Sequence, residues 1–209
     1  MTILDTFLPY QRSFFENAKK RKFLLSGRQL GKSHVIAGTM VFKALQRKNG
    51  LSLCISVNQR SAGELLKKCK MYADAVRQMT SGKVDYTISF DSVKFSTGAR
   101  VLSLPASSTA TRGWTANCVC VDEAFFVPRL DEIMTGIAPT LTRDPDSELI
   151  IASSAGAKNS YAFKIWEQAL QDRQHWHTQT VTVEDAIRDG LKLDLESLHS
   201  MVPDPQAFA

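Results

Sequence analysis

The sequence "LLSGRQLGKSHV" (residues 24–35) places a glycine-containing loop between two segments of different character. The segment "KFLLS" (22–26) is apolar and typical of a short strand, whereas "KSHVIAGTMVFKALQR" (32–47) is typical of a helix. Strand, glycine loop and helix are the setting of a phosphate-binding loop with the pattern G-x-x-x-x-G-K-[ST]. Ser26 stands at the first glycine position, and glycine follows at Gly27. The stretch therefore predicts a variant of that loop, with a chance glycine-lysine-serine turn as the alternative.

The chemistry of this loop follows from its residue types. Gly27 and Gly31 allow the backbone to turn its N–H groups toward phosphate oxygens, and the following helix adds its positive end. Lys32 is predicted to reach the β- and γ-phosphates, and the Ser33 hydroxyl to bind Mg²⁺. The predicted nucleotide-contacting residues of the loop are Ser26, Gly27, Arg28, Gln29, Leu30, Gly31, Lys32 and Ser33.

A second segment, "CVCVDEA" (118–124), is typical of a buried strand that ends in two adjacent acids. Asp122 is suited to hold Mg²⁺ in the manner of a Walker B acid. Glu123 is suited to be the general base that orients or deprotonates the attacking water. A solvated acidic strand end is the alternative for this segment alone. Together with the loop, in that order, it indicates a nucleoside triphosphatase.

Two arginines are candidates to stabilise charge on the transferred phosphoryl group. Arg28 lies inside the loop, where it could act on the nucleotide of its own chain or grip a structural acid. Arg112, in "TATRGWTA", lies in a predicted loop before the acidic strand, where it could reach a neighbouring subunit's nucleotide. A surface salt bridge is the alternative for each.

Two further pairs complete the predicted site. Ser153 and Ser154 follow an apolar strand, where their hydroxyls could sense the γ-phosphate or the attacking water. A strand-to-loop turn of small residues is the simpler interpretation of that pair. The Gln11 amide can donate and accept at once, as recognition of an adenine edge requires, and Tyr10 could stack on the base. An exposed glutamine and a half-buried tyrosine are the alternative.

Strand-like and helix-like segments alternate along the chain, which predicts an α/β fold with a mostly parallel sheet flanked by helices. Ligands of such sheets bind beyond the carboxyl ends of the strands, where the sheet would bring the loop, the two acids and the two serines together. We expect strands at 22–26, 51–57, 118–124, 147–159 and 177–186, short strands or hairpins in 84–106, and helices at 32–47, 60–79, 127–142 and 160–172, with a short helix in the tail 187–209.

Composition sets weaker limits. A net charge of +5 permits a polyanionic partner without requiring one. The runs "KKRK" (19–22) and "LLKKCK" (65–70), with Arg60, could follow a phosphate backbone or form solvated helix faces. Cys54, Cys118 and Cys120 lie in apolar runs, so we expect buried, reduced thiols. No segment approaches 18 uncharged apolar residues, so no membrane span is expected.

Taken together, these segments resemble the ATPase domain of the large subunit of bacteriophage terminases, motors that package DNA into procapsids. "FLPYQ" (7–11) is similar to the family's adenine-binding motif, "SGRQLGKS" (26–33) to its variant Walker A, "VCVDEA" (119–124) to its Walker B with catalytic glutamate, and "IIASSAG" (150–156) to its coupling motif. The family's loop often carries an arginine and lacks the first glycine. The resemblance thus makes Ser26 and Arg28 expected variants.

The resemblance implies a P-loop ATPase of the additional-strand, catalytic-glutamate type, with ATP and Mg²⁺ bound. It also implies double-stranded DNA as a partner, a homo-oligomeric ring on a portal protein, a terminase small subunit and a location in the host cytoplasm. An arginine at a place like Arg112 would be a trans-acting finger in that ring.

The resemblance also implies a division of the chain. Residues 1–180 would be the ATPase core, and 181–209 a small lid and the start of a linker. We expect no C-terminal nuclease domain and no DNA cleavage from this chain, hence an isolated ATPase domain.

Two other functions are the alternatives to a packaging ATPase. One is a superfamily 2 helicase-like translocase, for which 209 residues leave no room for the second domain that it needs; the other is a non-hydrolysing nucleotide-binding assembly module. Adjacent Asp122 and Glu123 argue against the latter.

Overall fold

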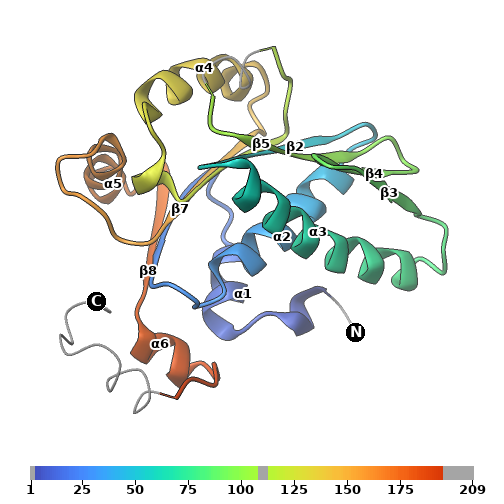
Figure 1. The fold of residues 1–209 in the computed structure, drawn as a ribbon, viewed down its shortest axis with the longest axis horizontal. Helices are drawn as coiled ribbons and strands as arrows, with labels where there is room; N and C mark the ends of the chain where they lie inside the picture. Colours follow the sequence, from blue (N-terminus) through green and yellow to red (C-terminus); the bar gives the residue numbers. More distant parts are fainter. Residues whose placement is uncertain (1–2, 108–112, 195–209) are drawn as a thin grey trace.

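The computed structural model describes residues 3–107 and 113–194, in which one eight-stranded sheet lies between two layers of helices (Figure 1). Six neighbouring strands are parallel, and an antiparallel hairpin extends one edge. The predicted α/β class with a mostly parallel sheet is confirmed. In chain order the elements are η1 (Ile3–Thr6), α1 (Pro9–Glu16), β1 (Arg21–Ser26), α2 (Lys32–Leu45), β2 (Leu51–Ser56), α3 (Gln59–Met79), β3 (Tyr86–Ile88), β4 (Ser92–Phe95), β5 (Arg100–Pro105), β6 (Cys118–Asp122), η2 (Ala124–Phe126), α4 (Leu130–Arg143), β7 (Glu148–Ser153), α5 (Tyr161–Gln171), β8 (Trp176–Val181) and α6 (Val183–Arg188).

The strand order is β3-β4-β5-β2-β6-β7-β1-β8. Strand β7 therefore lies between β1, which leads into the glycine loop, and β6, which ends in Asp122. This is the additional-strand arrangement that the resemblance implies. The register pairs Leu24 with Ala152 on one side of β7 and Asp122 with Ala152 on the other. The carboxyl ends of β1, β6 and β7, which carry the glycine loop, the two acids and the two serines, therefore meet at one edge of the sheet.

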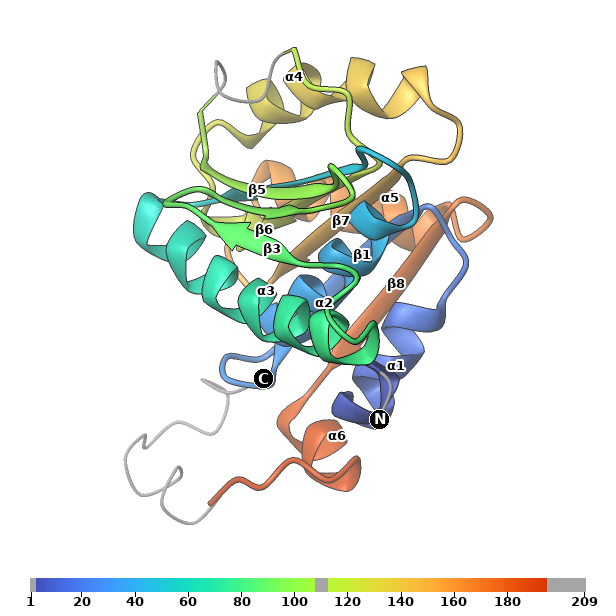
Figure 2. The same ribbon diagram turned by 90° about the vertical axis from the view of Figure 1, so that its right-hand side faces the viewer.

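Side chains alternate between the two faces of the central strands, as a period of two requires. Cys54, Cys118 and Cys120 enter the core beneath α1, α2 and α3, whereas Val119 and Val121 enter the core beneath α4 and α5. Figure 2 shows the sheet between these two layers. The cysteines are buried free thiols, as predicted, and burial raises the pKa of Cys118 well above its usual range.

The end of the chain departs from the predicted pattern. The sequence predicts a strand through residue 186, but β8 ends at Val181 and α6 begins at Val183. The cause is Thr182, whose hydroxyl accepts a hydrogen bond from Asp185 N while the Asp185 carboxylate accepts from Thr182 N. This capping box starts a helix in a stretch of strand-like composition. Residues 195–209 of the predicted lid and linker lie outside the described residues.

The basic run 19–22 does not form one solvated face. Lys22 lies in β1 and is fully buried, with Nζ 3.7 Å from the Glu148 carboxylate. Lys43 also pairs with Glu148. Burial lowers the pKa of Lys22, and Glu148 works in the opposite direction. Lys22 is therefore unavailable to an external phosphate backbone. Within the described residues, no helix is both long enough and apolar enough to cross a bilayer.

Candidate nucleotide-binding site

The glycine loop runs from the end of β1 to the start of α2. Ser26 is the last residue of β1, and Gly27 N donates to the Val181 carbonyl at 3.2 Å. Gly31 is the N-cap of α2 and has a φ of +79°, a left-handed conformation that favours glycine. No side chain in the described part of the chain caps this helix, so its positive end faces the loop. The loop thus has the backbone that anion binding requires.

Helix α1 braces the outside of the loop. The Tyr10 hydroxyl donates to the Leu30 carbonyl, and Gln11 Nε2 donates to the Gly31 carbonyl at 3.2 Å. Gln11 Oε1 accepts from Leu8 N at 2.9 Å, and the Gln11 residue is only 3% exposed. Both side chains are therefore engaged with backbone, and their predicted contacts with adenine remain a prediction.

Lys32, Glu123 and Ser154 form a hydrogen-bonded cluster beside the loop. Lys32 Nζ lies 2.8 Å from Glu123 Oε1 and donates to Ser154 Oγ at 3.3 Å. Glu123 Oε2 accepts from Ser154 N at 3.2 Å and from Ser154 Oγ at 3.4 Å. Burial alone raises the pKa of Glu123, but Lys32 and Ser154 outweigh burial and hold it below its ordinary value. The Glu123 carboxylate is therefore ionised at neutral pH, as a general base must be.

Ser153 links the strand end to the segment after β6. Its hydroxyl accepts from Phe125 N at 3.1 Å and lies 3.5 Å from Glu123 Oε2. Glu123 itself has a φ of 54° in the left-handed region, which is uncommon for a residue with a side chain. Such backbone conformations persist where the surroundings fix them, and they cluster at functional sites.

Asp122 is the last residue of β6 and is 6% exposed. Burial raises its pKa to about 6, against an opposing effect of the Lys32 charge. One carboxylate oxygen accepts from Glu123 N at 3.0 Å. The two adjacent acids thus have pKa values shifted in opposite directions by their surroundings.

A cavity of about 390 Å³ lies over the loop. It contains the predicted Lys32, Ser33 and Glu123, and two residues that the sequence analysis did not assign to it, Lys68 of α3 and His34 of α2. Burial lowers the pKa of His34, so its ring is neutral at physiological pH. The lining residues are Gly27, Arg28, Gln29, Gly31, Lys32, Ser33, His34, Lys68 and Glu123.

The two predicted arginines have different outcomes. Arg28 lies at the rim of the cavity, exposed, with its guanidinium 5.9 Å from the centre of the Phe126 ring. It therefore contacts the short helix η2 that follows Glu123. Arg112 lies outside the described residues, and its role as a finger stays a prediction.

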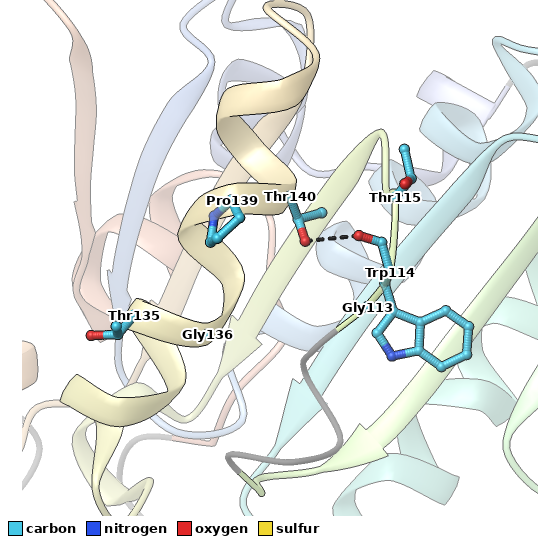
Figure 3. Close-up of a pocket in the computed structure, with 7 residues that line it drawn as sticks. All are labelled: Gly113, Trp114, Thr115, Thr135, Gly136, Pro139 and Thr140. Atoms are coloured by element: carbon cyan, nitrogen blue, oxygen red, sulfur yellow. Dashed lines mark hydrogen bonds between the residues drawn. The ribbon is translucent and has the colours of Figure 1, made fainter.

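A separate cavity of about 490 Å³ lies between α4 and the segment before β6 (Figure 3). Thr140 of α4 donates to the Trp114 carbonyl at 2.9 Å across it. Its described lining has no ionisable side chain, which makes it a poor site for a polyphosphate. The lining residues are Gly113, Trp114, Thr115, Thr135, Gly136, Pro139 and Thr140.

The residues over the loop fit a nucleoside triphosphate with Mg²⁺. Lys32 and the uncapped end of α2 suit phosphate, and the Ser33 hydroxyl and Asp122 carboxylate are oxygen ligands of the kind Mg²⁺ prefers. Within the described residues, no group of three His, Cys, Asp or Glu side chains could hold a metal ion on its own.

Fold and site together define an α/β protein of the P-loop type. Residues 23–209 match the family described as the terminase large subunit, T4likevirus-type, N-terminal. The chain belongs to this family of terminase large-subunit N-terminal domains.

Known proteins agree with this assignment. The chain is 28% identical over 199 residues to the probable terminase large subunit gp28 of Escherichia phage Mu, covering 88% of this chain and 36% of that protein's length. The large terminase ATPase domain of Thermus phage P74-26 has a TM-score of 0.72 at 16% identity, covering 98% of this chain and 92% of that one. A large terminase from a thermophilic bacteriophage, in complex with ADP, has a TM-score of 0.70 at 13% identity, covering 95% and 51%. At these identities the two structures show the shared fold.

Proposed function

We propose that this chain is a Mg²⁺-dependent ATPase that powers DNA translocation into phage procapsids. The observation that carries the proposal is the cluster of Lys32, Glu123 and Ser154 beside an uncapped helix end. The Lys32 ammonium group, suited to phosphate, and the ionised Glu123 carboxylate, suited to water, meet there, although Lys32 begins α2 and Glu123 follows β6. The ADP complex of the thermophilic phage terminase adds support, because its fold matches this one.

The residues divide the reaction between them. Glu123 takes a proton from the attacking water, whose oxygen bonds to the γ-phosphorus as the bond to the β–γ bridging oxygen breaks. Lys32 and Arg28 stabilise the negative charge on the phosphate oxygens. Ser33 and Asp122 would hold Mg²⁺, which neutralises phosphate charge when bound. Ser154 contacts both Lys32 and Glu123, so it holds their relative positions.

The larger machine is proposed from the family. The chain spans 36% of the Mu protein's length, so activities of the full protein rest on more than the described residues. Double-stranded DNA, a ring on a portal protein, a small subunit and the host cytoplasm are the proposed setting. Each Gln11 side-chain atom makes one backbone hydrogen bond, so adenine recognition would use the second N–H of Nε2 and the second lone pair of Oε1.

Steady-state ATP turnover with and without Mg²⁺ tests the proposal. The parent chain should hydrolyse ATP, and Glu123→Gln should lower turnover about a hundredfold or more, as expected for loss of a general base. Lys32→Ala should abolish binding and turnover. Glu132→Gln, an exposed substitution on α4, is the matched control and should behave like the parent. ATP binding without turnover in the parent would favour a non-hydrolysing assembly module.

A further inference from the structure

Three lysines of α3 differ in their surroundings. Lys67 pairs with Glu64 and Lys70 pairs with Asp74, each at 2.7 Å along the helix surface. Lys68 is half-buried, lines the cavity over the glycine loop, and has no carboxylate partner among the described residues. In the basic run of α3, Lys67 and Lys70 thus form solvent-exposed ion pairs, whereas Lys68 faces the cavity over the glycine loop.

The packing of α3 on α2 explains how Lys68 reaches the loop. Gly38 of α2 leaves space for Tyr72 of α3, since a Cβ at Gly38 would lie 2.9 Å from the Tyr72 ring. Lys68 precedes Tyr72 by one helical turn and therefore lies on the same face of α3. The close approach at Gly38 brings that face toward the start of α2.

Lys68 forms no salt bridge among the described residues, although its charge acts at longer range on Glu64. Lys32 is already engaged by Glu123 at 2.8 Å. A half-buried ammonium group is stabilised by an anion at hydrogen-bond distance, and a triphosphate in the cavity would supply one.

We propose that Lys68 binds the terminal phosphate of ATP and so distinguishes ATP from ADP at this site. The inference rests on the proposed ATPase function and extends it to a residue outside the two nucleotide motifs. The terminal phosphate is the ligand because Lys68 lines the same cavity as Lys32 and Glu123, the groups assigned to phosphate binding and to hydrolysis. Tyr10 and Gln11, the predicted adenine contacts, lie against the loop through α1.

The test compares the Kd of a non-hydrolysable ATP analogue with the Kd of ADP, by calorimetric titration in Mg²⁺. Lys68→Met and Lys68→Gln should weaken analogue binding about tenfold or more, as expected for a lost charge-assisted hydrogen bond, and leave ADP binding nearly unchanged. Lys68→Arg should restore part of the difference. Lys67→Met, the neighbouring exposed lysine, should match the parent. Equal thermal unfolding midpoints without nucleotide would exclude a general loss of structure.

Four outcomes would overturn the inference. Equal effects on analogue and ADP, or no effect on either, would do so while leaving the ATPase proposal intact. Loss of duplex DNA binding in a fluorescence anisotropy titration, with the analogue-to-ADP ratio unchanged, would make Lys68 a DNA contact instead. A parent chain that binds neither nucleotide would contradict both the proposed function and the inference. If the parent does bind nucleotide, Lys32→Ala should abolish that binding, which would place the nucleotide at the glycine loop.

Discussion

Lys32 and Glu123, 91 residues apart in the chain, form an ion pair of 2.8 Å between Nζ and Oε1. Lys32 begins α2, which follows β1 and the glycine loop, and Glu123 follows β6; β7 lies between β1 and β6 in the sheet. Lys32, which is predicted to bind phosphate, thus pairs with Glu123, which is predicted to activate water. Phosphate binding must compete with Glu123 for the Lys32 ammonium group.

This competition predicts that Glu123→Gln binds ATP more tightly than the parent while hydrolysing it more slowly. The substitution removes a negative charge beside the phosphate and frees Lys32, whereas the amide oxygen still accepts from Ser154. The pair is partly exposed, so the gain should be about 1 kcal/mol, or about fivefold in Kd. Calorimetric titration with a non-hydrolysable ATP analogue measures it, and Glu132→Gln is the control. Unchanged or weaker binding would contradict the proposed competition.

Asp122 gives a prediction for pH and stability. Its pKa is raised from 3.8 to about 6 in the fold, so the folded protein binds this proton more tightly than the unfolded chain. The resulting stabilisation is complete below pH 3.8 and is lost as the pH rises through about 6. In the absence of Mg²⁺ and nucleotide, Asp122→Asn should therefore be more stable than the parent at about pH 8, by on the order of 2 kcal/mol.

The pH dependence of the stability difference between Asp122→Asn and the parent serves as the control for this prediction. Denaturant unfolding of both proteins should show a difference that shrinks as the pH falls from about 8 to about 5. Other carboxyl groups have lowered pKa values and change stability with the opposite sign, but they are common to both proteins and cancel in the comparison. A constant difference across this range would show that burial of the Asp122 charge is not its source.

Alanine substitutions at Gly31 and Gly82 distinguish the loss of stability caused by backbone strain from the loss caused by a side-chain collision. Both have a φ of +79°, but a Cβ at Gly31 would lie 2.3 Å from Gln11 Nε2, whereas a Cβ at Gly82 meets nothing within 4 Å. Gly82→Ala should be destabilised by strain alone, by about 1 kcal/mol. Gly31→Ala should lose about 1 kcal/mol more, because Gln11 must give up its bond to the Gly31 carbonyl.

A double-mutant cycle checks this assignment by chemical denaturation. The excess loss at Gly31→Ala should disappear in a Gln11→Ala background, since the collision partner is then absent. An excess that survives Gln11→Ala would place its origin in the loop backbone.

Motifs with local signals were predictable from sequence. The strand, loop and helix around Lys32 follow from residue type and hydrophobic period, as do the two acids at the end of β6 and the two serines at the end of β7. Parallel strands then bring these ends to one edge without further information. The capping box at Thr182 was also readable, because Asp185 stands three residues after it, but the β-branched run before it favoured a longer strand.

Contacts that depend on tertiary packing were not predictable. Whether Lys68 or Lys67 faces the loop depends on how closely α3 approaches α2, which Gly38 and Tyr72 decide. The sequence offers both as members of one basic run. Likewise, the side chains of Tyr10 and Gln11 meet the backbone of Leu30 and Gly31 across 20 residues of chain, and no local pattern specifies a side chain to carbonyl bond of that kind.

Ser153 and Ser154 are adjacent, yet their contacts predict different roles. Ser153 is fully buried and accepts from Phe125 N, so Ser153→Ala leaves a backbone donor without its partner and should cost about 1–2 kcal/mol of stability. Ser154 contacts Lys32 and Glu123, so Ser154→Ala should change stability little and lower ATP turnover about tenfold through misplacement of Glu123. Thermal unfolding and steady-state turnover on both variants measure the two effects. Parallel losses in both variants would show that the pair acts as one structural turn.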